Sequence, residues 1–120
     1  MVEVDRNGNI SLSRGDVVRL PIIVNTKQYP EVRFLHSFYG DVNVYFFVVP
    51  WGMEPDRCLF MKKVEEYDSF SNFILTLYPE ETAEIEPGNH QYCIVAQCFY
   101  ENKTVSTCMV AQNRKFTVEG

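Results

Sequence analysis

Apolar and polar residues alternate along much of the chain, and a period of two is typical of β-strands with two distinct faces. In the clearest case, segment 41–51, even-numbered residues from Val42 to Val48 share one face and odd-numbered residues from Tyr45 to Val49 share the other. Similar patterns predict strands at residues 2–4, 10–12, 17–24, 58–65, 72–78, 90–100, 103–111 and 115–118. Residues 27–39 fit either a helical turn or a loop.

Turn-forming residues separate these predicted strands. Asn7-Gly8 is a strong hairpin signal. Pro79 is followed by acidic residues, which suits the first turn of a short helix. Pro21 lies inside strand 17–24 and cannot donate a ladder hydrogen bond, so we expect this strand at a sheet edge or at a bulge.

The number and spacing of these elements predict the fold class. Short strands separated by turns about every 8–12 residues, with at most one or two short helical turns, are typical of a sandwich. We therefore expect an all-β, immunoglobulin-like β-sandwich of about seven to nine antiparallel strands. A length of 120 residues suits one domain, 1–120.

The stretch Ser13-Arg14-Gly15-Asp16 contains the tripeptide RGD, which is also a cell-adhesion ligand. Its flanks favour a turn between two strands, because apolar residues alternate before it and an apolar run follows it. Gly15 supplies a free backbone and Asp16 a local side-chain acceptor. We therefore interpret this stretch as a turn.

Composition narrows the range of functions. The chain is rich in aromatic residues, with seven Tyr, nine Phe and one Trp, and its net charge is −5. No basic cluster exceeds Lys62-Lys63, which we interpret as a solvated strand end, so a nucleic-acid partner is not expected. The polar N-terminal residues do not suggest a signal peptide, and no apolar stretch is long enough to predict a membrane span.

The chain has four cysteines, Cys58, Cys93, Cys98 and Cys108. No pair has the CxxC spacing of a zinc site. All four lie in apolar runs, which favours reduced, buried thiols. Alternatively, a hairpin with Glu101 opposite Val105 would place Cys98 opposite Cys108, within reach of a disulfide.

Candidate catalytic and metal-binding residues are few. His36 and His90 are the only histidines, and no motif for nucleophilic catalysis or phosphate binding is present. Asp5, Asn7 and Asn9 resemble the start of a calcium loop, but the downstream Glu is missing, which favours a hairpin turn. We predict neither an enzyme, nor a cofactor, nor a metal site.

Four acidic residues gather on one connection, namely Glu80, Glu81, Glu84 and Glu86. A pair of carboxylates can perform acid–base chemistry. A solvated acidic turn explains the same residues without any activity, and we prefer it.

Two predicted strands are apolar on both faces, which is unusual for a half-exposed sandwich strand. If strands 41–51 and 90–100 are neighbours, one shared face is directed outward as a candidate protein interface. The residues of this face are Tyr45, Phe47, Val49, Cys93, Val95 and Phe99. Alternatively, segment 27–39 or the loop at Trp51 folds over this face.

Three aromatic residues lie in or near predicted loops, namely Trp51, Tyr39 and Tyr67. Such rings can stack on sugars, which makes a glycan- or host-surface-binding module the alternative function. Trp51 can equally cap the end of the sandwich core.

Residues 75–118 resemble the N-terminal immunoglobulin-like domain of phage baseplate upper proteins. The matching pieces are a strand at 75–78, Pro-Glu-Glu-Thr at 79–82, Pro-Gly at 87–88, an aromatic strand at 92–94 and Phe-Thr-Val at 116–118. The opening NGNISLSRGD is similar to the start of that family, and together these pieces cover about half of the chain. His90 departs from the pattern, in which an aromatic residue, often Tyr, begins the long strand.

The resemblance implies a phage or prophage virion structural protein of the tail or baseplate. Its partners would be other virion proteins or further copies of itself, and it would reside in the bacterial cytoplasm before joining the virion. In a sandwich, a Tyr near this corner hydrogen-bonds back across the connection. His90 can make that bond, and such a bond would depend on pH.

Overall fold

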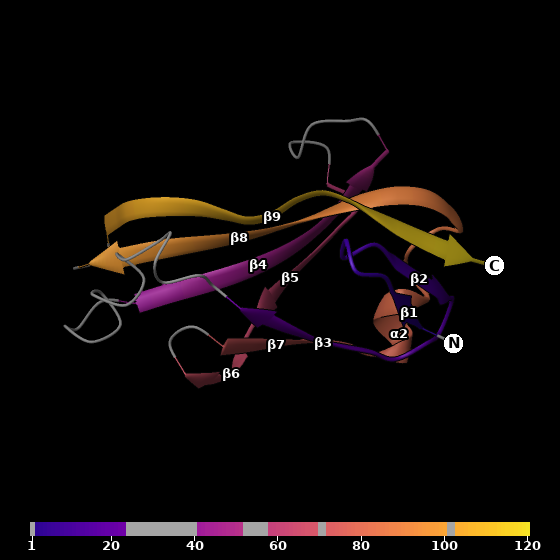
Figure 1. The fold of residues 1–120 in the computed structure, drawn as a ribbon, viewed down its shortest axis with the longest axis horizontal. Coiled ribbons are helices and arrows are strands. Elements are labelled where there is room, and N and C mark those ends of the chain that lie inside the picture. Colours follow the sequence, from indigo (N-terminus) through magenta and orange to yellow (C-terminus); the bar gives the residue numbers. More distant parts are fainter. Residues whose placement is uncertain (1, 24–40, 52–57, 70–71, 101–102) are drawn as a thin grey trace.

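The computed structural model describes residues 2–23, 41–51, 58–69, 72–100 and 103–120. The predicted element at 27–39 lies outside these residues. Two β-sheets form the two layers of the described fold (Figure 1). This confirms the prediction of an all-β sandwich.

The larger sheet has six strands in the order β1-β2-β9-β8-β4-β5. The smaller sheet has three strands in the order β3-β7-β6. The bounds are β1 (Glu3–Val4), β2 (Ile10–Ser13), β3 (Val18–Ile23), β4 (Asp41–Pro50), β5 (Phe60–Val64), β6 (Glu66–Ser69), β7 (Asn72–Leu77), β8 (Gly88–Tyr100) and β9 (Lys103–Glu119). A single helical turn, α2 (Pro79–Thr82), connects β7 to β8.

Most strand pairs are antiparallel, but β2 pairs with β9 in parallel. Strand β3, which contains Pro21, lies at the edge of the smaller sheet, as the missing backbone N–H predicts. Strand β9 is continuous, whereas the sequence pattern predicts two strands, 103–111 and 115–118. Residues 112–114 interrupt the apolar pattern without ending the strand, because backbone hydrogen bonds to β8 continue on both sides of them.

Bulges set the register of the long β8–β9 hairpin. Between the pairs Tyr92↔Arg114 and Ile94↔Ala111, β8 advances by two residues and β9 by three. Further register shifts follow each of the pairs Ile94↔Ala111 and Cys98↔Ser106. Each extra residue bends and twists the strand locally.

The register near the end of this hairpin excludes the alternative arrangement of the cysteines. Cys98 lies opposite Ser106, and Cys108 lies opposite Ala96. The alternative in which Cys98 faces Cys108 is wrong because the hairpin closes more tightly, with Tyr100 opposite Lys103. The prediction of a buried Cys58 is also wrong, since this thiol is exposed, while Cys93 is buried and free.

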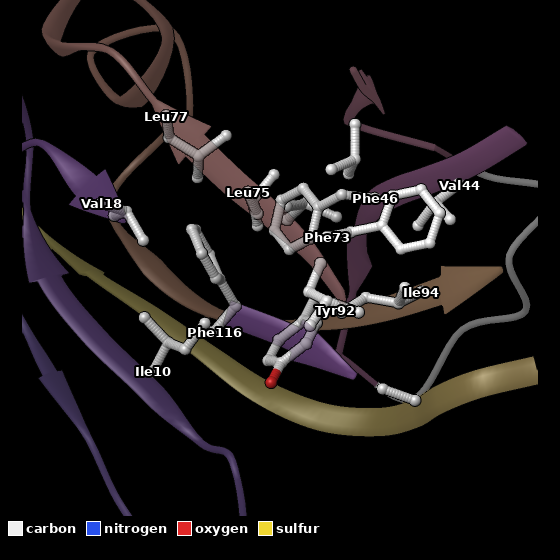
Figure 2. Close-up of a cluster of buried hydrophobic side chains, with 14 of the residues drawn as sticks. Ile10, Val18, Val44, Phe46, Phe73, Leu75, Leu77, Tyr92, Ile94 and Phe116 are labelled. Carbon is white, nitrogen blue, oxygen red and sulfur yellow. The ribbon is translucent and has the colours of Figure 1, made fainter. Parts of the chain in front are cut away.

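The core lies between the two sheets (Figure 2). Phe46 of β4 and Tyr92 of β8 place their ring centroids 5.5 Å apart, and Phe46 lies 5.8 Å from Phe116 of β9. Phe73 and Leu75 of β7 point into the same space from the smaller sheet (Figure 2). Each such side chain contributes about 1.5–3 kcal/mol when fully buried.

The RGD stretch is a turn between β2 and β3, as predicted. Gly15 has φ +85°, which favours glycine. The backbone N–H of Ser13 donates to the Asp16 carboxylate at 2.9 Å. The Arg14 guanidinium donates twice to the Ala83 carbonyl, at 2.6 and 3.1 Å. Arg14 and Asp16 are thus engaged within the fold, and Arg14 ties the turn to the end of α2.

Candidate functional site

The outward face of the six-stranded sheet carries the candidate interface. The predicted neighbours β4 and β8 do pair, with Tyr45 opposite Val95 and Phe47 opposite Cys93. Residues opposite each other in a ladder share a face. These residues therefore lie on the face opposite to Phe46 and Tyr92, which point into the core.

Five of the six predicted interface residues fall into two groups by their burial. Tyr45, Phe47 and Val95 are half-buried. Val49 and Cys93 have no exposed surface, so the expectation that they face solvent is wrong. Strand alternation places both residues on the outward face, but it does not encode what packs over that face.

The sixth predicted interface residue is placed by register alone. Phe99 lies on β8 opposite Asp41 of β4, and its side chain lies outside the described part. Strand β5 adds a residue that the sequence analysis did not select. Met61 lies opposite Phe47 and is 58% exposed.

Tyr45, Phe47, Met61 and Val95 form what we call the outer patch. The Tyr45 and Phe47 rings lie 6.3 Å apart and tilted, so they contact each other along β4. Lys63 lies opposite Tyr45 and is exposed beside the patch. An apolar patch bordered by a charge is typical of surfaces that bind other proteins.

Of the predicted sugar-stacking residues, the two that the structure describes, Trp51 and Tyr67, lie at different sheets. Trp51 follows β4 in the larger sheet and is 52% exposed. Tyr67 lies on β6 in the smaller sheet, is 54% exposed, and packs against the Phe73 ring at 5.8 Å. Tyr39 lies outside the described residues.

Trp51 instead borders a cavity of about 280 Å³ with Asn89, Lys115 and Thr117. The Lys115 ammonium lies 5.6 Å from the centroid of the indole ring. The Thr117 hydroxyl donates to the Asn89 side-chain oxygen at 3.3 Å. We call these four residues the Trp51 cavity.

Sequence reasoning missed Asn89, Lys115 and Thr117. Lys115 and Thr117 alternate with core residues in the last strand. This pattern indicates that they lie on the surface, but it does not indicate which residues lie beside them. Their proximity to Trp51 depends on the pairing of β8 with both β4 and β9.

His90 makes the contact that its corner position suggests. Its Nε2 lies 2.7 Å from the Glu86 carbonyl oxygen, four residues upstream. Because a carbonyl only accepts, Nε2 carries the proton in this bond.

Tyr92, two residues further along β8, joins the core to the N-terminal hairpin. Its hydroxyl donates to the Gly8 carbonyl. Burial raises the pKa of Tyr92 above its ordinary value of 10.0, because the charged phenolate is poorly solvated there.

The acidic connection contains one structural carboxylate. Glu81 pairs with Lys62 at 2.6 Å and accepts the Tyr78 backbone N–H at 3.0 Å. Lys62 also donates to the Thr76 carbonyl at 2.7 Å, so it links β5, β7 and α2. The prediction of solvated side chains is wrong for Lys62 and Glu81, because the sandwich brings them together.

The polar residues of the N-terminal turn hydrogen-bond to one another, as a hairpin turn predicts. The Asp5 carboxylate accepts the backbone N–H groups of Asn7 and Asn9 at 2.8 and 2.9 Å. The backbone and side-chain hydrogen bonds from Asn9, with those from Asn7 and Gly8, lower the pKa of Asp5 because they favour its charged form. This geometry belongs to a turn that closes the β1–β2 hairpin.

Comparisons with protein-family models, with curated proteins and with solved structures find no match for this chain. Within the described ranges, no helix has the length and apolar character needed to cross a bilayer. The same ranges contain no group of three or more His, Cys, Asp or Glu side chains that could ligate a metal ion. Function is therefore inferred from the two surface features above.

Proposed function

We propose that this chain is a non-enzymatic structural module of a phage or prophage virion, working in a tail or baseplate through protein–protein contacts. The outer patch is the observation that carries this proposal. It places two aromatic rings, Tyr45 and Phe47, beside the exposed Met61 on one sheet face. Aromatic and Met side chains are enriched in protein interfaces.

The order of motifs between residues 75 and 118 supports the virion setting, and the sandwich architecture is compatible with an immunoglobulin-like domain. On this proposal the protein resides in the bacterial cytoplasm during assembly and then in the virion. A repeated subunit needs a surface that a second copy or a neighbouring virion protein can cover. The outer patch is such a surface.

The first test is the absolute molar mass in solution, measured by light scattering behind a sizing column over about a hundredfold range of concentration. Self-assembly through the outer patch predicts a mass that is a multiple of 14.0 kDa. The variants Phe47→Lys and Val95→Lys should return the mass to that of one chain, because a buried, unpaired charge is costly at an interface.

Tyr67→Lys is the matched control, since it places the same charge on an exposed aromatic position of the other sheet. It should leave the mass unchanged. Circular dichroism of all three variants should retain the β signature. A 14.0 kDa monomer at every concentration contradicts self-assembly. Unfolding of both outer-patch variants would show that this face is core.

A further inference from the structure

The Trp51 cavity is built by strand register at the end of the outward face. Pro50 pairs with His90, so Trp51 follows the last residue of the β4 ladder and lies next to Asn89. Asn89 pairs in turn with Thr117 of β9. Strands β8 and β9 and the residue after β4 therefore supply three neighbouring side chains at this end of the sheet.

Lys115 adds a charge from the next row of the same face. Its own backbone is anchored, because its N–H donates to the Asn9 side-chain oxygen at 2.9 Å. Its ammonium reaches the indole at 5.6 Å. The cavity thus combines an aromatic face, an ammonium group, an amide and a hydroxyl.

This combination suits a saccharide better than a purely apolar ligand. A half-exposed indole offers a flat apolar surface on which the C–H face of a sugar ring can pack. Asn89 and Thr117 together offer donors and acceptors for ring hydroxyls. An apolar surface with a few placed polar groups is the usual composition of a small-ligand site.

The Lys115 charge specifies the ligand further. Among the described residues the ion pairs are Arg19–Glu66 and Lys62–Glu81, and neither of them includes Lys115. Two carboxylates follow on this face by register, namely Glu119 beyond Thr117 along β9 and Glu3 beyond Ser11. The local charge of this ammonium therefore favours an anionic group, against the net charge of −5 of the chain.

We infer that the Trp51 cavity binds an anionic saccharide, with the sugar ring against the indole and its carboxylate on the Lys115 ammonium. The inference does not rest on the assembly role, because the cavity and the outer patch share no residue.

Trp51 is the only tryptophan in the chain, so its fluorescence reports directly on this cavity. The probe is a tetrasaccharide that contains glucuronic acid, and the reference ligand is the neutral cellotetraose. We expect a saturable change in emission with the acidic probe and at least about tenfold weaker binding of the neutral one, since charge-assisted hydrogen bonds are the stronger kind. High salt should weaken the acidic complex.

Single substitutions test separately the contributions of the Lys115 charge and of the Trp51 ring to binding. Lys115→Gln should lose about tenfold in affinity for the acidic probe and little for the neutral one. Trp51→Ala should abolish binding of the acidic probe in calorimetry. Tyr67→Ala removes an equally exposed ring from the other sheet and should bind like the parent protein in both assays.

Three results would overturn the inference. A flat response to the acidic probe means that the cavity is not a saccharide site. Equal affinities for the acidic and neutral probes mean that Lys115 does not select an anion. The same saturation with inorganic phosphate as with the tetrasaccharide means that the cavity binds small anions and does not recognise a sugar. None of these results affects the molar-mass test of assembly.

Discussion

The two faces of the β4–β8 ladder have nearly the same apolar character and different surroundings. On one face, Phe46 and Tyr92 are buried against the smaller sheet. On the other face, Tyr45, Phe47 and Val95 are only half-buried. The comparison shows that an apolar strand face becomes core only where a second layer covers it. Where it stays partly exposed, it can serve a partner.

The largest expected difference between the faces is in packing. Phe46→Ala should destabilise the protein by about 3–5 kcal/mol, because it opens a cavity in a closed core. Phe47→Ala, from the adjacent position, should cost about 1–2 kcal/mol because its ring is only partly buried. Urea denaturation of both variants measures the free energies of unfolding. Equal losses would mean that both faces are core.

Substitution of the two adjacent lysines of β5 compares the two faces of the sheet through charged residues. Lys62 lies opposite Phe46 and is held by Glu81 and Thr76, whereas Lys63 lies opposite Tyr45 and is exposed. Lys62→Met should cost about 1–2 kcal/mol, since it leaves a half-buried carboxylate without its partner. Lys63→Met should change stability by less than about 0.5 kcal/mol. Thermal unfolding at matched pH would show whether the two variants differ in this order.

Tyr92 tests the core face through its hydroxyl. Tyr92→Phe removes the hydrogen bond to Gly8 and should cost about 1 kcal/mol at neutral pH. Because the pKa of Tyr92 is raised in the folded protein, its contribution is fully present below the ordinary value of 10.0 and is lost as pH rises through the folded value. Stability measured from pH 8 to 12 should therefore fall more steeply above about pH 10 for the parent than for the variant. Parallel curves would contradict this assignment.

The smallest effect is one of access and not of stability. Cys93 lies on the outward face yet has no exposed surface, whereas Cys58 is exposed. Brief alkylation followed by peptide mapping should label Cys58 quickly, because only an accessible thiolate reacts. Cys93 should react only under conditions that unfold the protein. Rapid labelling of Cys93 in the native state would show that this part of the outward face opens to solvent.

Much of the local structure could be predicted from the sequence because its causes are local. Alternation predicts β4 and β8, Pro21 predicts an edge strand, and Gly15 with Asp16 predicts the turn at the RGD stretch. Each of these features follows from side-chain periodicity or from backbone freedom within a few residues. The outward position of Tyr45 and Phe47 follows from the same period of two.

The candidate sites were only partly predictable. Trp51 could be selected as an aromatic residue beside a turn, but the residues that share its cavity come from β8 and β9. The interface prediction correctly placed Tyr45 and Val95 on one face of two neighbouring strands. It wrongly expected Val49 to be exposed. Burial of Val49 depends on atoms beyond the ladder, which the pattern of one strand cannot report.

Alternation and turn chemistry thus determined most of the strands and turns and which residues of a regular strand share a face, because these depend on neighbours along the chain. Tertiary structure decided the parallel pairing of β2 with β9 and the hairpin register that places Cys98 opposite Ser106 and not opposite Cys108. It also decided that Lys62 meets Glu81 and that Lys115 meets Trp51. These contacts join residues that are distant in sequence. They depend on strand register and on the packing of the two sheets, which are set only when all strands pair in the folded protein.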